Sequence, residues 1–387
     1  MRDASVPSDP LRSIRVCHVI HSLQPGGAED SLGSIAEAAQ VANVEVEVVS
    51  LLPLEQSRVA QRLRRNGTPV MSLNLRSRWD ARALPAAAKL LASRAPDVIH
   101  AHLKHADLVC AYASRKTGLP MVSTLHVVED RVSGLGWAKR SAGAWARRRG
   151  AHTTIAVSDA QRTWYVDALG ASADHVVTVR NGVADPPPLE LFERQRIRDG
   201  LGVGQGELLV ATVGIMRPGK GHEDVLSLAA AVGADAKVRF VLAGDGELRA
   251  SLEARAAVLA PRSAPVVFAG FRDDVPSLLA ASDLVLHPSH ADALPTALLH
   301  ALAVGRPTAA YGVGGVPEIV TPTSGIVVEP LDEDALLAAF GRLVSSQELR
   351  NELGAGARRR YEQEFTLEAW MHRLREVYLR AMGQSRS

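Results

Sequence analysis

The chain has 387 residues. This is too long for a single ordinary hydrophobic core and fits two domains of about 180 to 200 residues each. Hydrophobic residues make up 47% of the chain and charged residues 22%, a composition that excludes disordered and fibrous proteins. The formal net charge is only +2, and we expect no nucleic-acid partner.

The first segment and the cysteines bear on where the protein works. Residues 1–13 mix charge, Pro and Ser without an apolar stretch, so we expect a disordered tail rather than a signal peptide. No apolar run approaches the ~18 residues that span a bilayer. Cys17 and Cys110 are isolated and make no disulfide framework. We therefore expect a soluble, cytoplasmic protein.

The first half of the chain alternates short apolar runs with stretches of helical period. Helices are predicted at 28–40 and 82–94, and strands at 14–20, 44–51, 97–101, 121–125 and 154–157. Strands that alternate with helices indicate a parallel sheet covered on both faces. The pattern predicts an N-terminal Rossmann-like domain over residues 14–184.

A break at Asn181-Gly182 and a stiff Pro-rich linker at 185–189 separate this domain from the next. The alternation then restarts over 190–365, and 366–387 contain a long amphipathic helix, predicted at 367–382. Strands are predicted at 208–213, 238–243, 266–268, 284–287, 308–311 and 325–328. The expected fold class is α/β, with two Rossmann-like parallel-sheet domains that face a cleft, and such sheets bind ligands beyond the carboxyl ends of their strands.

Two stretches of the second domain carry residues suited to an anion. Arg217 and Lys220 lie in a Gly/Pro loop between a predicted strand and helix, and they can converge on a diphosphate as a planar fork and a point charge. The alternative for this loop is a solvated turn. Further on, Asp292 precedes a helix that Pro295 opens, and His300 lies one turn into it. The alternative there is a helix cap and a partly buried polar residue.

Glycines and histidines in the first domain suggest two more sites. Gly26 and Gly27 follow the first predicted strand, where the backbone can approach a phosphate or sugar. His100, His102 and His105 could suggest a metal, but no Cys or well-spaced carboxylate completes a ligand set. We therefore expect no metal.

A basic helix is predicted near residues 137–150. Its cations are Lys139, Arg140, Arg147, Arg148 and Arg149, and its apolar residues include Leu135, Trp137 and Trp145. Such a helix can rest on an anionic membrane, which would give peripheral contact with the inner face. The alternative is a solvated helix whose tryptophans pack inward.

Several short sequence segments between about Arg15 and Arg375 occur in the order that one known family shows. They comprise His18-Val19-Ile20 with Gly26-Gly27-Ala28-Glu29, Pro96-Asp97-Val98-Ile99-His100-Ala101-His102, Thr124-Leu125-His126, Val157-Ser158, Asn181-Gly182-Val183, Gly214 with Arg217 and Lys220-Gly221-His222, Gly244-Asp245-Gly246, and Gly314-Gly315-Val316-Pro317-Glu318-Ile319. Together they resemble the retaining glycosyltransferases of family four, which have the glycosyltransferase B fold.

The resemblance implies roles for individual residues. Arg217 and Lys220 would hold the donor pyrophosphate and stabilise the leaving group, and His126 would contact the transferred sugar. Asp292 completes the implied catalytic set. The implied donor-binding residues are Gly26, Gly27, Gly214, Phe271, Arg272, Leu294, Pro295, Thr296, Ala297 and His300, and the implied acceptor-side residues are His102 and Ser158. The family works without a bound metal or cofactor, with the nucleotide-diphosphate sugar as co-substrate, and its last helix crosses back onto the N-terminal domain.

This sequence departs from the family pattern at two important positions. Relatives carry two glutamates eight positions apart, where this chain has Asp292 and His300. Asp keeps the charge with a shorter reach, whereas a His cannot accept hydrogen bonds from two hydroxyls as a carboxylate does. Ala184 also replaces an Asp that often follows Asn-Gly-Val in relatives.

The predicted function is transfer of a sugar from a nucleotide-diphosphate sugar to an acceptor hydroxyl, with retention of configuration. The acceptor can be a saccharide, a lipid-linked sugar or a small metabolite. The alternatives are a non-catalytic nucleotide-binding relative and a nucleotide-sugar epimerase of the same fold, since fold alone does not separate these functions.

Overall fold

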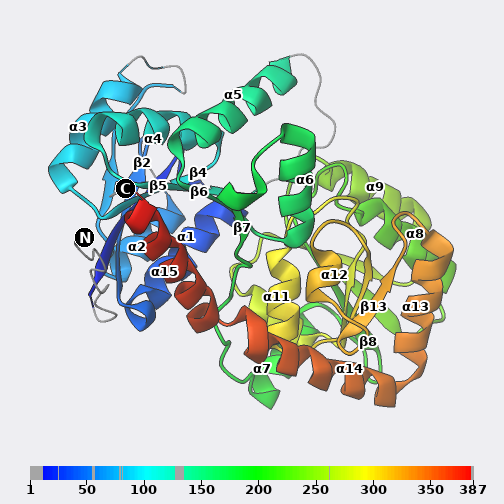
Figure 1. Ribbon diagram of the computed structural model, residues 1–387. Helices are drawn as coiled ribbons and strands as arrows, with labels where there is room; N and C mark the ends of the chain where they lie inside the picture. Colours follow the sequence, from blue (N-terminus) through cyan, green and yellow to red (C-terminus); the bar gives the residue numbers. More distant parts are fainter. Residues whose placement is uncertain are drawn as a thin grey trace. The chain divides into compact units, whose positions relative to one another are not determined.

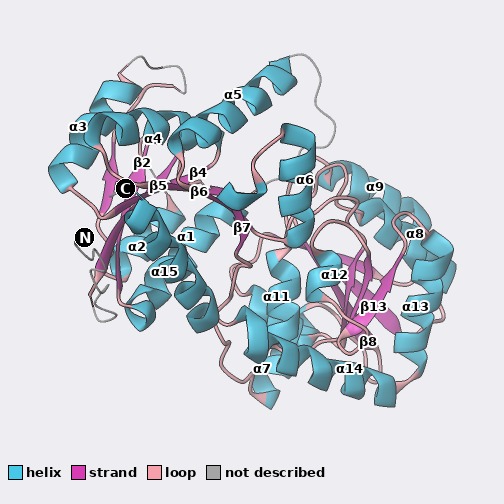
Figure 2. Ribbon diagram, viewed as in Figure 1, coloured by secondary structure: helices cyan, strands magenta, loops and turns pink. Residues whose placement is uncertain are grey.

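The structure, a computed structural model, describes residues 12–24, 26–54, 57–77, 80, 82–126, 135–260 and 262–384, without the side chains of 135–142 and 384. The chain divides into two compact units, Met1–Asn181 with Leu367–Ser387, and Gly182–Thr366. Each unit is a parallel β-sheet with helices on both faces (Figures 1 and 2). We call them the N-unit and the C-unit.

The described strands of the N-unit form a parallel sheet in the order β3-β2-β1-β4-β5-β6-β7. Its strands are β1 (Ile14–Ile20), β2 (Val44–Ser50), β3 (Val70–Ser72), β4 (Val98–His102), β5 (Met121–Leu125), β6 (Thr153–Ala156) and β7 (Val176–Thr178). Its helices are α1 (Gly27–Ala38), α2 (Arg58–Arg65), α3 (Ala83–Arg94), α4 (Lys104–Thr117), α5 (Leu135–Gly150), α6 (Asp159–Leu169) and α15 (Leu367–Gln384).

Alternation along β1 builds a separate core on each face of this sheet. Val16 and Ile20 pack with apolar residues of α1, α2 and α15 on one face. Cys17 and Val19 point to the other face and pack with α3 and α4, because successive side chains of a strand point to opposite sides. The C-terminal helix α15 contributes Tyr378 to the first of these cores, so the chain's last helix is part of the N-unit fold (Figure 1).

The described strands of the C-unit form a second parallel sheet, in the order β10-β9-β8-β11-β12-β13. Its strands are β8 (Leu208–Val213), β9 (Val238–Ala243), β10 (Val266–Gly270), β11 (Leu284–His287), β12 (Thr308–Tyr311) and β13 (Gly325–Val328). Its helices are α7 (Leu191–Gly200), α8 (His222–Val232), α9 (Arg249–Leu259), α10 (Val275–Ala281), α11 (Thr296–Ala303), α12 (Val316–Ile319), α13 (Glu333–Ser345) and α14 (Gln347–Arg360).

The segment that joins the two units is held more tightly to the C-unit than a free linker would be. Val183 donates its amide to the Phe365 carbonyl at 2.9 Å and forms a parallel bridge with Thr366. Asp185, at the start of the expected linker, pairs with Arg358 at 2.5 Å. The C-unit therefore begins at Gly182, slightly before the Pro-rich stretch.

Most predicted elements are present with small shifts at their ends, and two strands were missed. β3 and β7 span three residues each, too short to show a hydrophobic period in the sequence. Within the described ranges, every helix is too short or too polar to cross a membrane.

Candidate functional site

Two loops at the carboxyl ends of C-unit strands pack tightly against each other. Gly221, which ends the loop after β8, has a φ of +70°, and a Cβ there would lie 1.8 Å from the Pro288 carbonyl oxygen in the loop after β11. The amide of His290 donates to the Gly219 carbonyl at 2.9 Å. Only glycine allows both this backbone angle and this close approach, so the two loops are held in a fixed relation.

This packing brings Lys220 onto Asp292. Lys220 Nζ lies 2.5 Å from Asp292 Oδ1, and His287 Nε2, at the end of β11, lies 3.1 Å from Asp292 Oδ2. Burial alone would raise the pKa of Asp292, but the hydrogen bonds and charges of His287 and Lys220 hold that pKa well below its usual range. Asp292 is therefore ionised at neutral pH and orients the lysine.

Arg217 lies in the same loop, and its side chain is exposed. Among the residues that the structure describes, none forms an ion pair or a side-chain hydrogen bond with its guanidinium. The loop thus presents one oriented ammonium and one guanidinium that is available to an anion. The alternative of an ordinary solvated turn does not account for the part-buried Lys220–Asp292 pair.

Sequence reasoning assigned no role to four residues that support these loops. His287 was assigned to a strand but not to a site, and it binds Asp292. Asp224, on α8, accepts a hydrogen bond from Tyr311 at 3.2 Å and lies 2.9 Å from His290 Nε2. A His at the carboxyl end of a strand, as in His287, was the signal available in the sequence.

The other expected donor-binding residues of the C-unit follow neighbouring strands. Phe271, directly after β10, is exposed, while Arg272 pairs with Asp274 at 2.5 Å. Gly214 directly follows β8, and His300 is half-buried on the second turn of α11. The remaining four flank or open α11: Leu294 and Pro295 are buried, and Thr296 and Ala297 are half-buried in the first turn.

Asp292 is no helix cap, which corrects one of the alternatives. The residue that caps α11 is Pro295, and both carboxylate oxygens of Asp292 are turned to Lys220 and His287. The Asp292 backbone is fixed as well. A Cβ on Gly314, whose φ is +49°, would lie 1.8 Å from the Asp292 carbonyl oxygen.

In the N-unit, histidines gather at the carboxyl ends of β1, β4 and β5. His126, directly after β5, is half-buried, and its Nε2 lies 2.9 Å from His102 Nδ1. His102 Nε2 lies 2.9 Å from His18 Nδ1. His102 is only 1% exposed, and its role on the acceptor side stays a prediction.

The histidines whose ring nitrogens lie close together are not the three that the sequence suggested. His18, His100 and His102 bring ligand atoms within 4.8 Å of one another, because β1 and β4 are neighbours and His18 is paired with His100. His105 instead stacks on His21. Both ring nitrogens of His100 are already engaged, with Tyr378 at 2.9 Å and Thr124 at 2.7 Å. That the protein works without a metal stays a prediction.

Two further expected residues of the N-unit lie at helix starts. Gly27 is the first residue of α1 and Gly26 its N-cap. Ser158 is the N-cap of α6, and its buried hydroxyl accepts from the Gln161 amide. The cap accounts for Ser158 structurally, and its role on the acceptor side stays a prediction.

The predicted basic helix is present as α5, but one of its cations is internal. Arg147 is 5% exposed and binds Asp107 Oδ2 at 2.5 Å and Tyr165 at 2.9 Å. Trp145 is exposed, which contradicts an inward packing of this tryptophan, and Arg149 lies over its ring. The side chains of Leu135, Trp137, Lys139 and Arg140 lie outside the description.

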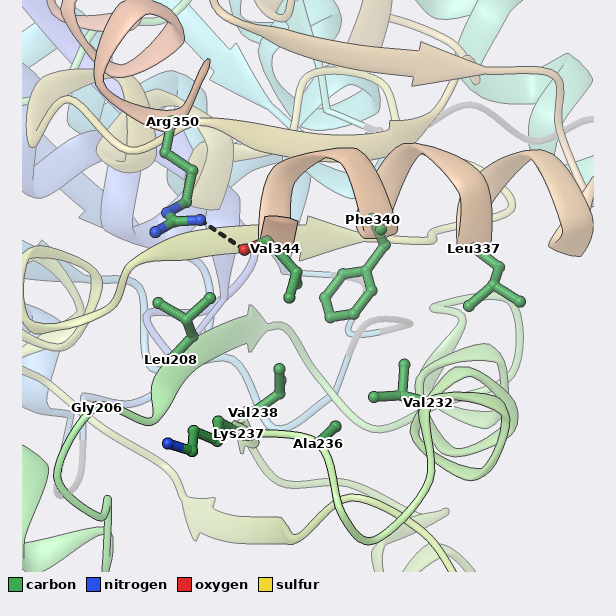
Figure 3. A pocket seen from close by; sticks show the side chains of 11 residues that line it. Gly206, Leu208, Val232, Ala236, Lys237, Val238, Leu337, Phe340, Val344 and Arg350 are labelled. Carbon is green, nitrogen blue, oxygen red and sulfur yellow. Dashed lines mark hydrogen bonds between the residues drawn. The ribbon is translucent and has the colours of Figure 1, made fainter. Parts of the chain in front are cut away.

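A pocket of about 520 Å³ in the C-unit lies away from these loops. Figure 3 shows Leu208 and Val238, at the starts of β8 and β9, facing Phe340 and Val344 of α13. Arg217 and Lys220 follow the carboxyl end of a strand, whereas the pocket lies at the amino ends of the strands, on the opposite end of the sheet. This apolar pocket is therefore separate from the candidate anion site.

The C-unit and N-unit each match a known family. Residues 193–360 match the family described as Glycosyl transferases group 1, and residues 25–185 match Glycosyltransferase Family 4. Among curated relatives, the chain is similar to a 2-deoxystreptamine N-acetyl-D-glucosaminyltransferase from Streptomyces fradiae, with 32% identity over 321 residues that cover 76% of this chain and 73% of that one.

A second relative and a solved structure agree with these matches. A 2-deoxystreptamine glucosyltransferase from Streptomyces kanamyceticus is 32% identical over 276 residues, which cover 67% of this chain and 70% of the relative. Anabaena HepE in complex with UDP and glucose shares the fold, with a TM-score of 0.82, 23% identity and coverage of 94% of this chain and 99% of that one. The chain therefore belongs to glycosyltransferase family 4, has the glycosyltransferase B fold and is a glycosyltransferase that uses a nucleotide-sugar donor.

Proposed function

We propose that this glycosyltransferase moves a sugar from a nucleotide-diphosphate sugar to a hydroxyl of a small cyclitol acceptor, with retention of configuration and without a metal. The observation that carries the proposal is the pairing of Lys220 with Asp292 at 2.5 Å in a loop that also exposes Arg217. A metal-independent transferase needs cations for its leaving group, and this loop supplies two.

The charge of the leaving group grows as the reaction proceeds. The bond between the anomeric carbon and the diphosphate oxygen breaks, and the acceptor oxygen bonds to the anomeric carbon from the same face. The acceptor proton passes to the departing phosphate oxygen. Arg217 and Lys220 would stabilise the negative charge that develops there, because preorganised charges act most strongly where charge appears in the transition state.

The lysine can serve the diphosphate without leaving Asp292. An ammonium has three donor hydrogens, of which Asp292 engages one. The carboxylate keeps unused lone pairs beyond those facing Lys220 and His287, and these could accept hydroxyls of the transferred sugar. Asp292 would thus stand in for the glutamate of relatives, with His300 near the ribose or phosphate.

The acceptor class rests on what the relatives act on. Two of them are named for 2-deoxystreptamine, and a third, D-inositol 3-phosphate glycosyltransferase from Acidothermus cellulolyticus, is 28% identical over 67% of this chain. Both acceptors are six-membered carbocycles that carry several hydroxyls. Their shared chemistry favours a cyclitol over a lipid-linked sugar.

The experiment is a transfer screen that crosses UDP-N-acetylglucosamine, UDP-glucose and GDP-mannose with 2-deoxystreptamine, inositol, inositol phosphate and simple sugars, with and without EDTA. A thermal-shift screen identifies the nucleotide first, because a ligand at ~100 times its dissociation constant adds about 2.7 kcal/mol of stability. We expect product with at least one cyclitol, in amounts that EDTA does not change. Product with simple sugars alone would overturn the cyclitol assignment, and loss of activity in EDTA would overturn metal independence.

A further inference from the structure

Three histidines of the N-unit form a continuous hydrogen-bonded row, which we call the histidine row. It comprises His18 on β1, His102 on β4 and His126 after β5. His18 Nδ1 and His102 Nε2 are 2.9 Å apart, as are His102 Nδ1 and His126 Nε2. The row starts in the sheet interior, where His18 is 0% exposed, and ends at the half-buried His126.

All three rings are neutral at pH 7. Burial lowers the pKa of His18 to about 3 and that of His126 to about 4. Burial, together with the neighbouring histidines, holds the pKa of His102 well below its ordinary value. A neutral imidazole carries one proton, so one of its nitrogens donates and the other accepts.

Two hydrogen bonds among three neutral rings leave only two arrangements of the protons. If His18 donates from Nδ1 to His102, then His102 must donate from Nδ1 to His126, whose own proton is then on Nδ1. If His126 donates inward from Nε2 instead, all three rings carry their proton on Nε2. The tautomers of the row are therefore coupled: the nitrogen that carries the proton in His18 determines which nitrogen carries it in His126.

The inner end of the row favours the first arrangement. Within the described part of the chain, His18 Nε2 is buried and has no hydrogen-bond partner. The second arrangement would place a proton there and leave a buried N–H without an acceptor, a situation that is rare in proteins. The first leaves only an unused lone pair at that position.

The rings next to the row keep it in place. His100 stacks on His102 with ring centroids 4.3 Å apart. His100 is itself held between Tyr378 of α15 and Thr124 of β5. The orientation of His102 is thus fixed by packing as well as by its two hydrogen bonds.

We propose that His18 and His102 are positioning residues that keep the proton of His126 on Nδ1, so that this nitrogen is a permanent hydrogen-bond donor. Free neutral histidine prefers the other tautomer, so the row reverses the intrinsic preference. Under the proposed function, on which this consequence rests, the Nδ1–H would donate to a hydroxyl oxygen of the transferred sugar. The row itself does not depend on that contact.

The direct test is NMR of the full chain with ¹⁵N-labelled histidine rings at pH 7. Two-bond correlations from the carbon-bound ring protons distinguish Nδ1–H from Nε2–H, and the His126 signals are assigned by their loss in His126→Gln. We expect Nδ1–H for His126 in the unaltered protein. Nε2–H would overturn the proposal outright, and this measurement needs no variant of the row to fold.

Variants then test whether His126 depends on the row. His102→Leu and His18→Leu remove a link, while His105→Leu makes the same change outside the row and serves as the matched control. We expect the two row variants to shift His126 toward Nε2–H and the control to leave it on Nδ1–H. A His126 that stays on Nδ1–H in His102→Leu would show that the row does not set its tautomer.

Kinetics separate the row from the proposed sugar contact. We expect His102→Leu to lower kcat/KM about tenfold, as for the loss of one hydrogen bond, while UDP alone, which lacks the sugar, binds unchanged. A tautomer shift with unchanged kcat/KM would confirm the row and overturn the contact between His126 and the sugar. The two failures are thus distinguishable.

Discussion

Arg217 is exposed, whereas Lys220 is held by Asp292, and the two cations should therefore respond differently to removal. We expect Arg217→Ala and Lys220→Ala each to lower kcat about a hundredfold, since loss of one electrostatic contact to the transition state costs about 3 kcal/mol. Only Lys220→Ala should also lower the melting temperature, because it leaves the part-buried Asp292 carboxylate with His287 alone.

The matched control for these cations is Lys237→Ala. Lys237 is an exposed cation of the same unit that lines the pocket at the amino ends of the strands. Steady-state kinetics and thermal unfolding of the three variants give the comparison. Turnover in Arg217→Ala or Lys220→Ala that equals Lys237→Ala would remove that residue from the mechanism.

The resemblance to the family implies that Asp292 and His300 stand where relatives carry two glutamates, and we expect their variants to separate kcat from KM. His300→Ala should raise the donor KM more than it lowers kcat, because a ribose or phosphate contact is present in ground and transition states alike. Asp292→Ala should lower kcat more than it raises KM, because it orients Lys220 at the reacting bond. Reversed effects would exchange the two roles.

Two further replacements, Asp292→Glu and His300→Glu, introduce the glutamates that the resemblance implies, one at a time. Initial-rate kinetics over a range of donor concentrations measures both constants. We expect His300→Glu to lower the donor KM, since a carboxylate can accept from both ribose hydroxyls. An unchanged donor KM in both His300 variants would make the residue structural.

The histidines show which residue contacts the sequence predicts and which it does not. His100 and His102 lie two residues apart on one strand and therefore share a face of the sheet, and the structure places their rings together. His18 was not connected with them, because the order of strands in the sheet brings β1 beside β4 and no local pattern encodes that order. The pairing of Lys220 with Asp292 likewise joins two loops that are distant in sequence.

At the scale of elements, α5 is more than a basic surface helix. Its Arg147 forms a buried ion pair with Asp107 of α4, with side chains 6% and 0% exposed. Burial opposes the charge on Asp107 and raises its pKa, although Arg147 and Ser123 partly offset that effect. Removal of one partner from a buried pair is strongly destabilising, since it leaves the other charge uncompensated.

We therefore expect Arg147→Met to lower the free energy of unfolding by about 3–5 kcal/mol. Arg149→Met is the control on the same helix, since Arg149 is exposed and only lies over the Trp145 ring. Urea unfolding followed by circular dichroism measures both. Equal midpoints for the two variants would mean that the Asp107–Arg147 pair contributes little.

The central strands were predictable because most of their residues are apolar, as expected in a sheet covered on both faces. Met121–Leu125 and Leu208–Val213 were predicted with the bounds that the structure has. The edge strand β3 and the edge strand β7 were missed. Each of these strands has only three residues, and pairing with a neighbouring strand is what makes them extended. A tertiary contact of this kind leaves no hydrophobic period in the sequence.

At the scale of the whole molecule, the buried histidines tie stability to pH. Burial holds the pKa of His18 at about 3 and that of His126 at about 4, below the ordinary value of about 6.5 that they regain on unfolding. Between these values the unfolded chain binds protons that the folded chain does not. Stability is therefore fully present above about pH 6.5 and is lost as the pH falls toward 4.

Each such histidine should contribute a slope of about 1.4 kcal/mol per pH unit in this window. Urea unfolding at several pH values between 4 and 7 measures this slope. His18→Asn should reduce the slope by the contribution of one histidine. Carboxylates contribute to the total slope, but they are common to both proteins and cancel in the comparison. A slope that His18→Asn leaves unchanged would contradict the assignment of a neutral buried His18.

The most direct test of the proposed reaction is the ¹H NMR spectrum of the transfer product formed from an α-linked nucleotide-sugar donor of the gluco series and the best acceptor of the screen. We predict an anomeric proton with the small coupling constant of an α-glycoside, formed in step with the nucleoside diphosphate. A large coupling constant, typical of a β-glycoside, would contradict retention. Release of nucleotide without any new glycoside would contradict transfer to the acceptor.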